Sequence, residues 1–419
     1  MNAEVISLGC RLNLAESESI RALLGSANDV VVVNSCAVTA EAVRQTRQAI
    51  RKARRARPDA RLLVTGCAAD IERDRLAAMP EVDGLVPNAA KLDARSYATG
   101  LKKSARPELF EGPLFSSQTV QKEERPFDKL RANGNELSHT RAFVAVQNGC
   151  DHACTFCVIP QGRGPSRSLT VPQVLREVER HLAQGALEVV LTGVDVTSWG
   201  QDLPAQPRLG ALVCAILAAF PELERLRTSS LDGVEIDEQL FELFAGEPRV
   251  MPHLHLSLQH GHDLILRRMK RRHSRAEALH LVDRLRMRRP DTAIGADLIA
   301  GFPTEDEAMH QANLSIVREL AIVHGHVFPY SPRPRTPAAR MPQVDKGTIK
   351  RRAAELRAAV ADVRERWLRS LVGTALSVLA EADGTGHAGN FARVAVPQGT
   401  RRGAILAITP TRLAEGVLQ

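Results

Sequence analysis

The chain has 419 residues, so we expect two to four domains, and a hydrophobic content of 44% is sufficient for packed cores. It begins without a basic stretch that leads into an apolar run, so we expect no signal peptide. It contains no run of about 18 apolar residues, so we expect no membrane span. We therefore expect its seven cysteines to lie in a reducing cytoplasm. A net charge of +8 is compatible with a polyanionic partner such as RNA without requiring one, whereas 4% aromatic residues argue against broad base-stacking surfaces.

The N-terminal third alternates short apolar runs with helical patterns. Asn13 followed by Glu16 has the spacing of a helix N-cap and its reciprocal partner. The alternation predicts an α/β domain of three layers, with a parallel sheet covered by helices, over residues 1–105. The strands are expected at 4–9, 29–34 and 61–66, with helices at 13–24 and 41–57 between them.

One cysteine follows each of these strands: Cys10, Cys36 and Cys67, here called the N-terminal triad. Ligand sites of such sheets lie beyond the carboxyl ends of the strands, so three separate loops would bring one thiol each to a common region. A single cysteine after a strand is usually a small buried hydrophobic residue, so unrelated core thiols are the alternative. The equivalent positions favour a [4Fe–4S] cluster held by three cysteines, with one iron left open.

Two neighbouring segments are polar. The helix expected at 41–57 is rich in arginine. Its arginines form either an ordinary solvated face or a surface that contacts phosphates. Residues 106–138 contain proline, glycine and mixed charge, which predicts an interdomain linker.

The most specific pattern is the C-x3-C-x2-C spacing of Cys150, Cys154 and Cys157, here called the barrel triad. Three thiolates hold three irons of a [4Fe–4S] cluster and leave the fourth iron to chelate S-adenosylmethionine (SAM), whose cleavage yields a deoxyadenosyl radical. Zinc is the weaker alternative, because a structural zinc site normally has four ligands and His152 is crowded between the cysteines. An odd number of neighbouring cysteines disfavours disulfides.

Six strand–helix units around this motif predict an open, partial (β/α)6 barrel over residues 139–370. Chemistry in such barrels lies at the carboxyl ends of the strands, where the barrel triad is also expected. Other groups there become candidates for holding SAM, although each alone is also a common turn or cap residue. These candidates are Gly193, Asp195, Ser229 and Gln259. The strands are expected at 141–147, 187–193, 225–230, 253–258, 293–299 and 323–328, with helices at 172–184, 236–245, 262–270, 275–288 and 305–320.

Three further features follow in the second half of the chain. His253 and His255 share one face of a strand, where hydrogen-bonded neutral imidazoles are favoured over metal ligation. The basic cluster at 267–272 is either a solvated helix end or a nucleic-acid contact. Residues 371–419 contain short β segments separated by glycine and polar turns, which predicts a small β-barrel of a kind that often binds RNA.

Motifs along nearly the whole length resemble those of the radical SAM methylthiotransferases. The segments that carry the resemblance are Leu8–Asn13, Asn34–Val38, Gly66–Cys67, Gly149–Cys157, Gly193–Gly200, Leu258–Gly261, Met269–Arg271, Asp297–Pro303 and Tyr330–Pro337. The resemblance implies an N-terminal α/β domain, a radical SAM partial barrel and a C-terminal β-barrel called TRAM. It also implies two [4Fe–4S] clusters and SAM, with the barrel triad on the SAM-cleaving cluster and the N-terminal triad on an auxiliary cluster that carries the sulfur. Arg335 and His260 depart from the usual glycine and serine.

Within that family, Asn34–Arg51 is most similar to the branch that acts on N6-threonylcarbamoyladenosine beside the tRNA anticodon. The same-chemistry alternatives are the branches acting on isopentenyladenosine in tRNA or on an aspartate of a ribosomal protein. A zinc-stabilised RNA-binding protein without catalysis is the alternative from another class. The resemblance implies the tRNA anticodon stem-loop and an electron donor such as flavodoxin or ferredoxin as partners of a monomer, and leaves the sulfur donor unspecified.

Overall fold

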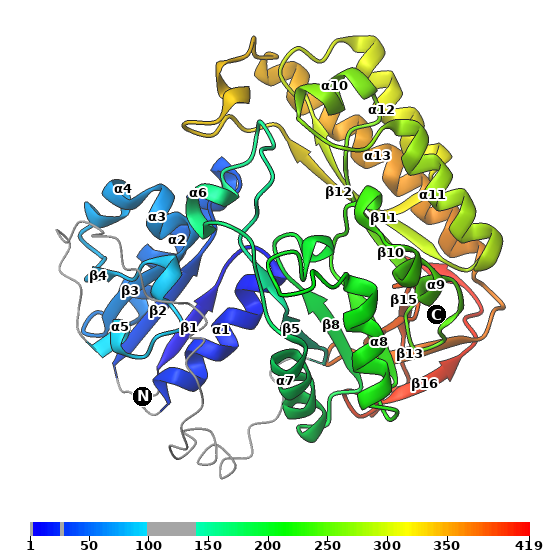
Figure 1. Cartoon of the computed structure of the whole chain (residues 1–419), viewed down its shortest axis with the longest axis horizontal. Coiled ribbons are helices and arrows are strands. Elements are labelled where there is room, and N and C mark those ends of the chain that lie inside the picture. The colour runs from blue at the N-terminus through cyan, green and yellow to red at the C-terminus, as the bar shows by residue number, and fades with distance from the viewer. Residues whose placement is uncertain (1–2, 26–28, 99–139) are drawn as a thin grey trace. The chain divides into compact units, whose positions relative to one another are not determined.

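The structure is a computed structural model that describes residues 3–25, 29–98 and 140–419 (Figure 1). Contacts divide the chain into two compact units, one of residues 1–138 with 158–164 and the other of residues 139–157 with 165–419. The predicted linker at 106–138 lies outside the described residues. Within the described ranges, no helix is long and apolar enough to cross a membrane.

The first unit is built on a parallel sheet in the order β1-β2-β3-β4 (Figure 1). Alternate residues of β2 and β3 point to opposite faces, so Val33 packs with Ile50 in one core and Val32 with Ile20 in the other. This arrangement confirms the predicted α/β domain with a parallel sheet. Its strands are β1 (Glu4–Ser7), β2 (Val30–Ser35), β3 (Arg61–Gly66) and β4 (Gly84–Leu85), and its helices are α1 (Arg11–Leu24), α2 (Ala40–Ala56), α3 (Cys67–Ile71), α4 (Arg73–Ala77) and α5 (Arg95–Ala98).

A short helix from the middle of the chain, α6 (Ile159–Arg163), also belongs to the first unit. It packs closely on α3, because a Cβ atom on Gly162 would lie 3.0 Å from Ile71 Cδ1 and 3.6 Å from Cys67 Cα. The Asn88 side chain donates a 2.6 Å hydrogen bond to the carbonyl of Gly162. The chain therefore passes from the second unit into the first immediately after the barrel triad.

The second unit contains two parallel three-stranded sheets, β5-β8-β9 and β10-β11-β12, joined by a parallel bridge between Leu231 and Leu256. Helices follow the strands in the predicted order, which confirms the repeated β/α units. The strands are β5 (Ala142–Ala145), β8 (Glu188–Thr192), β9 (Arg225–Thr228), β10 (His253–Gln259), β11 (Ala293–Ala300) and β12 (Ile322–Pro329), with a small pair β6 (Gln147–Asn148) and β7 (Arg167–Ser168). The helices are α7 (Val171–Ala183), α8 (Leu209–Ala219), α9 (Glu238–Gly246), α10 (Asp263–Arg268), α11 (Arg275–Arg288), α12 (Glu307–Glu319) and α13 (Lys346–Ser370).

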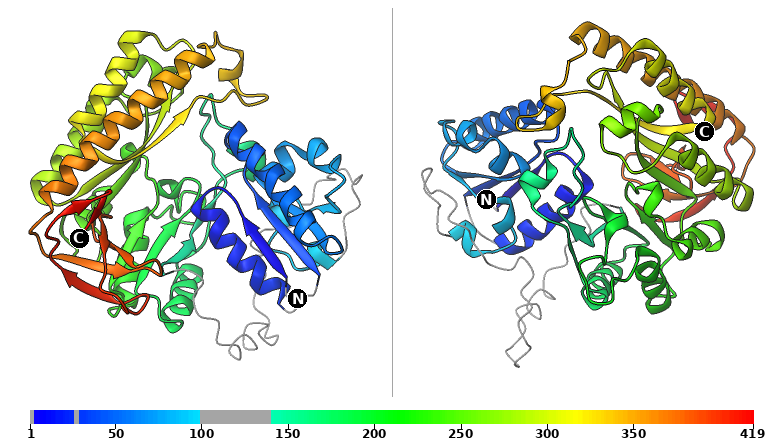
Figure 2. Two further views of the ribbon diagram at one scale, coloured as in Figure 1. Left: turned by 180° about the vertical axis from the view of Figure 1, so that it is seen from behind. Right: turned by 45° about the horizontal axis from the view of Figure 1, so that its top comes forward.

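One face of the second sheet is covered by helices α12 and α13 (Figure 2, left). Gly325 of β12 permits close packing, because a Cβ atom there would lie 2.6 Å from a methyl carbon of Val360. Side chains alternate along a strand, so His324 and His326 point to the opposite face of the sheet.

Residues 371–419 form a mixed sheet of six strands in the order β16-β13-β14-β15-β18-β17. Its core contains Val378, Val394 and Leu418, packed on Leu368 from the end of α13. The predicted short β segments are confirmed, and closure into a small barrel stays a prediction. The strands are β13 (Leu376–Ala380), β14 (Thr385–Ala388), β15 (Arg393–Ala395), β16 (Ile405–Ile408), β17 (Leu413–Ala414) and β18 (Val417–Leu418).

Candidate functional site

The N-terminal triad lies at the carboxyl edge of the first sheet. Cys10 follows β1, Cys36 follows β2, and Cys67 is the first residue of α3 directly after β3. The backbone before Cys10 lies against Cys36, because a Cβ atom on Gly9 would be 2.8 Å from the Cys36 sulfur. The pKa of Cys36 is raised to about 11, mainly by burial; the neighbouring Cys67 and Cys10 thiols contribute to the rise, and a backbone hydrogen bond opposes it. The three loops therefore bring their thiols together.

Gly66 fixes the backbone from which Cys67 projects. Its φ is +87°, and a Cβ atom there would lie 2.4 Å from the Ser35 carbonyl oxygen. Gly185 has the same φ of +87° with nothing within 4 Å of such a Cβ atom. We expect Gly66→Ala to destabilise the protein by about 1–3 kcal/mol more than Gly185→Ala, because only the first adds a clash with backbone. Urea unfolding followed by circular dichroism measures both variants; equal losses would contradict a steric constraint at Gly66.

Asn13 and Glu16 do not form the predicted helix cap. Helix α1 begins at Arg11 with Cys10 in the N-cap position, so the prediction is wrong. The Asn13 amide instead donates to the carbonyls of Leu8 and Ser35, at 2.7 and 3.0 Å. Both predicted cap residues are buried, and their tertiary contacts take precedence over the local motif.

Glu16 is instead paired with two buried cations, Lys91 and Arg163. The Arg163 guanidinium lies 2.8 Å from Glu16 Oε1, and each of the two cationic side chains is 2% exposed. Burial opposes ionisation of Glu16, but Lys91 and Arg163 outweigh it and hold the pKa of Glu16 below its usual range. Burial also works against the Arg163 charge, whereas Glu16 and the nearby Cys67 raise the Arg163 pKa above its usual value. Two cations against one carboxylate leave positive charge beside Cys67, which suits an anionic cluster bound by thiolates.

The barrel triad lies on the loop that follows β6, and all three cysteines are half-buried. The pKa of Cys150 is raised to about 12, mainly by burial; Asp195, Cys157 and Cys154 contribute to the rise, and a backbone hydrogen bond from His152 opposes it. The Cys150 sulfur lies 3.9 Å from Asp195 Oδ2. The three thiols are thus close to one another and to one of the predicted SAM-binding residues.

The loop is anchored by the two residues between Cys154 and Cys157. The Thr155 hydroxyl donates a 2.8 Å hydrogen bond to the carbonyl of Arg268, and its backbone carbonyl accepts one from Ala338. Phe156 packs edge-on against Phe302, with ring centroids 6.5 Å apart. These contacts fix the backbone while leaving the cysteine side chains at the carboxyl ends of the strands.

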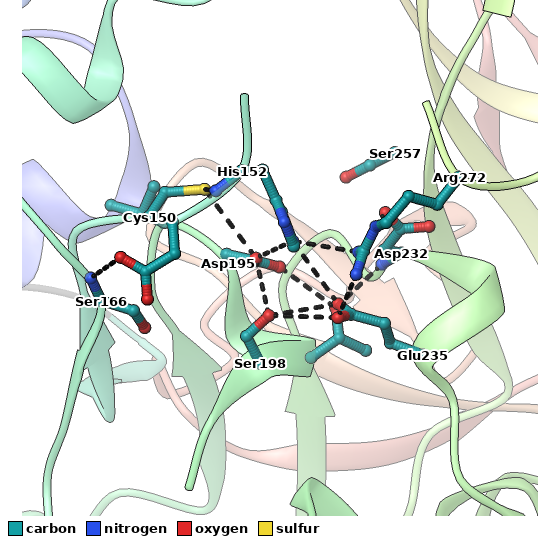
Figure 3. A network of polar contacts seen from close by, with 12 residues as sticks. Cys150, His152, Ser166, Asp195, Ser198, Asp232, Glu235, Ser257 and Arg272 are labelled. Atoms are coloured by element: carbon teal, nitrogen blue, oxygen red, sulfur yellow. Dashed lines mark hydrogen bonds and ion pairs between the residues drawn. The ribbon is translucent and has the colours of Figure 1, made fainter. Parts of the chain in front are cut away.

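Charged side chains surround Cys150 (Figure 3). His152 is paired with Asp195 and Glu235, whose hydrogen bonds raise the His152 pKa to about 10 against the effect of burial. Arg272 donates to Glu235 at 2.6 Å and to Asp232 at 3.0 Å. Burial opposes the charge of Asp232, but His273, Arg271 and Arg272 outweigh it and keep the Asp232 pKa low. At Glu235, His152 and Arg272 outweigh burial and keep the Glu235 pKa low. His152 is therefore a member of an ion network at neutral pH.

Arg271 connects this network to the barrel triad. Its guanidinium donates to Asp232 at 2.8 Å, to the Ser257 carbonyl at 2.9 Å and to the Cys154 sulfur at 3.6 Å. Its side chain is 7% exposed, so neither a solvated helix end nor a nucleic-acid contact is correct for Arg271. We infer that it positions Cys154.

Gln147 connects the cysteine loop to the end of β8. Its amide nitrogen donates to the Gly149 carbonyl at 2.8 Å, and its amide oxygen accepts hydrogen bonds from the backbone of Val194 and Asp195. A Cβ atom on Gly193 would lie 2.8 Å from the Gln147 carbonyl, so the two segments approach closely. Gly193 and Asp195 are thereby held beside the barrel triad.

The other two candidates lie at strand ends but outside this network. Ser229 directly follows β9, and Gln259 ends β10 with a left-handed φ of +68°. Among the described residues, neither side chain hydrogen bonds to the cysteine loop. Their role in SAM binding stays a prediction.

Sequence reasoning missed Gln147, Asp232, Glu235 and the positioning role of Arg271. Each had a positional signal: Gln147 ends a predicted strand, and the two carboxylates follow another strand within a few residues. Arg271 lies in one of the family-like motifs. Arg335, where the family usually has glycine, has a φ of +64°, which explains the preference for glycine.

Comparisons with known proteins match both halves of the chain. Residues 144–313 match the model of the Radical SAM superfamily, and residues 2–87 match that of the Uncharacterized protein family UPF0004. The threonylcarbamoyladenosine tRNA methylthiotransferase MtaB of Rickettsia prowazekii (strain Madrid E) is 40% identical over 100% of this chain and 97% of its own length. The chain belongs to the tRNA methylthiotransferase family.

Two other members of this tRNA methylthiotransferase family are more distant. MtaB of Aquifex aeolicus (strain VF5) is 32% identical over 89% of this chain and 91% of its own length. The tRNA-2-methylthio-N(6)-dimethylallyladenosine synthase of Frankia alni (strain DSM 45986 / CECT 9034 / ACN14a) is 34% identical over 99% of this chain and 86% of its own length. The resemblance identified from the sequence motifs is confirmed.

A solved structure shares the fold. The radical SAM methyltransferase TsrM of Kitasatospora setae superposes with a TM-score of 0.52 at 17% identity, covering 77% of this chain and 66% of that one. As a tRNA methylthiotransferase with a radical SAM domain, the protein uses SAM and two [4Fe–4S] clusters. The residues fit these groups, because all seven cysteines are free thiols and two sets of three cluster at strand ends.

Proposed function

We propose that the protein adds a methylthio group to carbon 2 of N6-threonylcarbamoyladenosine, next to the anticodon of tRNA. The observation that carries this proposal is the presence of two three-cysteine groups, each at the carboxyl ends of its own parallel strands. A single cluster would support SAM cleavage alone, whereas sulfur insertion needs a second metal site. The full-length relative from Rickettsia prowazekii, named for this substrate, supports the choice of nucleoside.

In this proposal Cys150, Cys154 and Cys157 hold the SAM-cleaving cluster, and the N-terminal triad holds the auxiliary one. When bound, these groups and SAM supply a radical that can remove hydrogen from an inert C–H carbon, together with the sulfur and the methyl group. Arg271 holds the cysteine loop through Cys154, and Gln147 holds it through Gly149. Buried Arg163 and Lys91 place positive charge beside the N-terminal triad.

The remaining assignments belong to the same proposal. Gly193, Asp195, Ser229 and Gln259 would contact SAM from the ends of their strands. Residues 1–105 would form the auxiliary-cluster domain, 139–370 the radical SAM barrel and 371–419 a TRAM-like RNA-binding module. A flavodoxin or ferredoxin would deliver electrons to a monomer in the cytoplasm.

Part of helix α2 offers cations for tRNA phosphates. Arg44 and Arg54 are paired with Glu41 and Asp83, whereas Arg47, Lys52 and Arg55 make no ion pair among the described residues. Unpaired cations on one helix suit phosphate oxygens, and each contact releases counterions.

We expect replacement of Arg47, Lys52 and Arg55 by glutamine to weaken tRNA binding and to lower the slope of log Kd against log[KCl] by up to about 0.9 per residue. Fluorescence anisotropy with labelled tRNA at several KCl concentrations measures the slope. Arg44→Gln is the matched control, because the Arg44 charge is already paired with Glu41. An unchanged slope in the triple variant would place the tRNA surface elsewhere.

The function itself is tested by nucleoside analysis of tRNA from a strain that lacks the gene. We expect loss of 2-methylthio-N6-threonylcarbamoyladenosine, retention of its unmethylthiolated precursor, and restoration by the parent gene but not by Cys10→Ala. The Frankia alni relative makes the isopentenyl-type nucleoside the second candidate. Loss of 2-methylthio-isopentenyladenosine instead would favour that candidate, and no change in either nucleoside would overturn the proposal.

A further inference from the structure

His255, Asp297 and His326 meet on three neighbouring strands of the second unit, on the face opposite to the one where Gly325 packs on Val360. They come from β10, β11 and β12, which are adjacent and parallel. Asp297 and His326 are direct register partners, and His255 lies opposite Gly295, two residues before Asp297. The sheet therefore fixes the Cα positions of all three residues.

The three side chains converge on a single carboxylate oxygen. His255 Nε2 lies 3.2 Å and His326 Nδ1 lies 3.1 Å from Asp297 Oδ1, and the three candidate ligand atoms lie within 4.8 Å of one another. Neighbouring ligand atoms held at about 2.0–2.1 Å by one ion are about 2.8–3.0 Å apart in octahedral geometry and about 3.3–3.4 Å apart in tetrahedral geometry. The observed separations already match two edges of such a coordination polyhedron.

Gly295 makes this convergence possible. A Cβ atom at Gly295 would lie 2.3 Å from His255 Nδ1, so the imidazole ring rests directly on the backbone of β11. Any larger residue would displace His255 from Asp297. The absence of a side chain at this position is therefore part of the construction of the cluster.

The charge and exposure of the cluster suit a cation. Asp297 Oδ1 lies within hydrogen-bond distance of His255 Nε2 and His326 Nδ1, so one carboxylate oxygen and two ring nitrogens face one another. The His255 side chain is 8% exposed and the His326 side chain 58%, which leaves the cluster open on one side. Two imidazoles and one carboxylate with open positions form a donor set used for Zn²⁺ and Fe²⁺.

We propose that His255, Asp297 and His326 bind one divalent transition-metal ion, separate from both cysteine triads. The ion would join three strands of the barrel, and water or an oxygen-donor ligand would fill its open positions. Two alternating histidines on one strand are weak evidence for a metal, and for that reason the sequence favoured neutral imidazoles. In the structure, His326 on β12 and the Asp297 carboxylate join His255, and these two further ligands favour a metal site.

Zinc uptake by the cluster-loaded full chain tests the proposal. We expect equilibrium dialysis against micromolar ZnCl2, with bound zinc counted by mass spectrometry, to show about one zinc per chain more in the parent than in Asp297→Asn. Loss of a ligand should weaken zinc binding at least about tenfold, because mutation of residues that only hydrogen bond to metal ligands already lowers metal affinity by that factor. Zinc should also raise the Tm of the parent but not of this variant. Unfilled cysteine sites cancel in the comparison, because both proteins carry the same cysteines.

Two further variants keep the test decisive. His326→Gln removes a largely exposed ligand, so it should fold normally and also lose the zinc. His253→Gln is the matched control, because His253 lies on the same face of β10, 6.1 Å from His255 between ring centroids, but outside the cluster. Equal zinc uptake by the parent, Asp297→Asn and His326→Gln would overturn the proposal and leave a hydrogen-bond network only.

Discussion

Cys150→Ala is expected to retain about four of the about eight irons of the reconstituted parent and to lose all reductive cleavage of SAM. Two cysteines leave the barrel cluster without a stable ligand set, whereas the N-terminal triad lies on other strands and is untouched. Anaerobic reconstitution followed by iron and sulfide analysis gives the cluster count. Deoxyadenosine formation measured by mass spectrometry gives the cleavage activity.

The paired variant Cys10→Ala should also retain about four irons but keep SAM cleavage and lose methylthio transfer. This divergence separates the two triads by function as well as by position. Cys214→Ala is the matched control, because this thiol lies in α8 and accepts a hydrogen bond from Gln239, so the iron count should not change. A colourless parent that binds zinc and neither iron nor sulfide would contradict both expectations and favour a zinc-stabilised RNA-binding protein.

The positions of both triads were predictable from the sequence, because each triad lies directly after strands whose ends can be recognised in the sequence. Runs such as those of β2 and β3 are buried on both faces, so their ends are visible in composition alone. Once the strands are placed, parallel topology requires Cys36 and Cys67 to share an edge. The same logic placed Asp195 near Cys150, and the structure shows a separation of 3.9 Å between their side chains.

The contacts that hold these thiols were not predictable in the same way. Asn13 and Glu16 match a local capping motif, but Arg163, 147 residues away from Glu16, redirects it into a buried ion pair. The role of Arg271 was equally unpredictable, because a basic run at a helix end does not indicate that one of its arginines pairs with the buried carboxylate of Asp232. Local patterns report the elements, whereas such long-range charge pairs depend on how the elements pack.

Glu16→Gln is the second change with a large expected effect. The variant leaves Arg163 and Lys91 buried with no ionised partner at Glu16, and breaking a buried pair in this way costs about 3–5 kcal/mol. The loss should concentrate in the first unit, so hydrogen exchange of the β2 and β3 amides, followed by mass spectrometry, should accelerate strongly. Glu41→Gln is the matched control on helix α2, because the exposed pair of Glu41 with Arg44 contributes little.

The same ion pair predicts a pH dependence with a definite sign. The folded-state pKa of Glu16 lies below the ordinary value of 4.5, so its stabilising contribution is complete above that value and is lost as the pH falls through the folded-state pKa. The parent should therefore lose protection of β2 and β3 on acidification, and Glu16→Gln should lack this part of the acid response. If exchange in the variant matched the parent at neutral pH, the pair would not stabilise the first unit. Helix α6 begins just after the barrel triad and carries Arg163, which pairs with Glu16 of α1. Such a result would therefore also mean that this ion pair does not anchor α6 to α1.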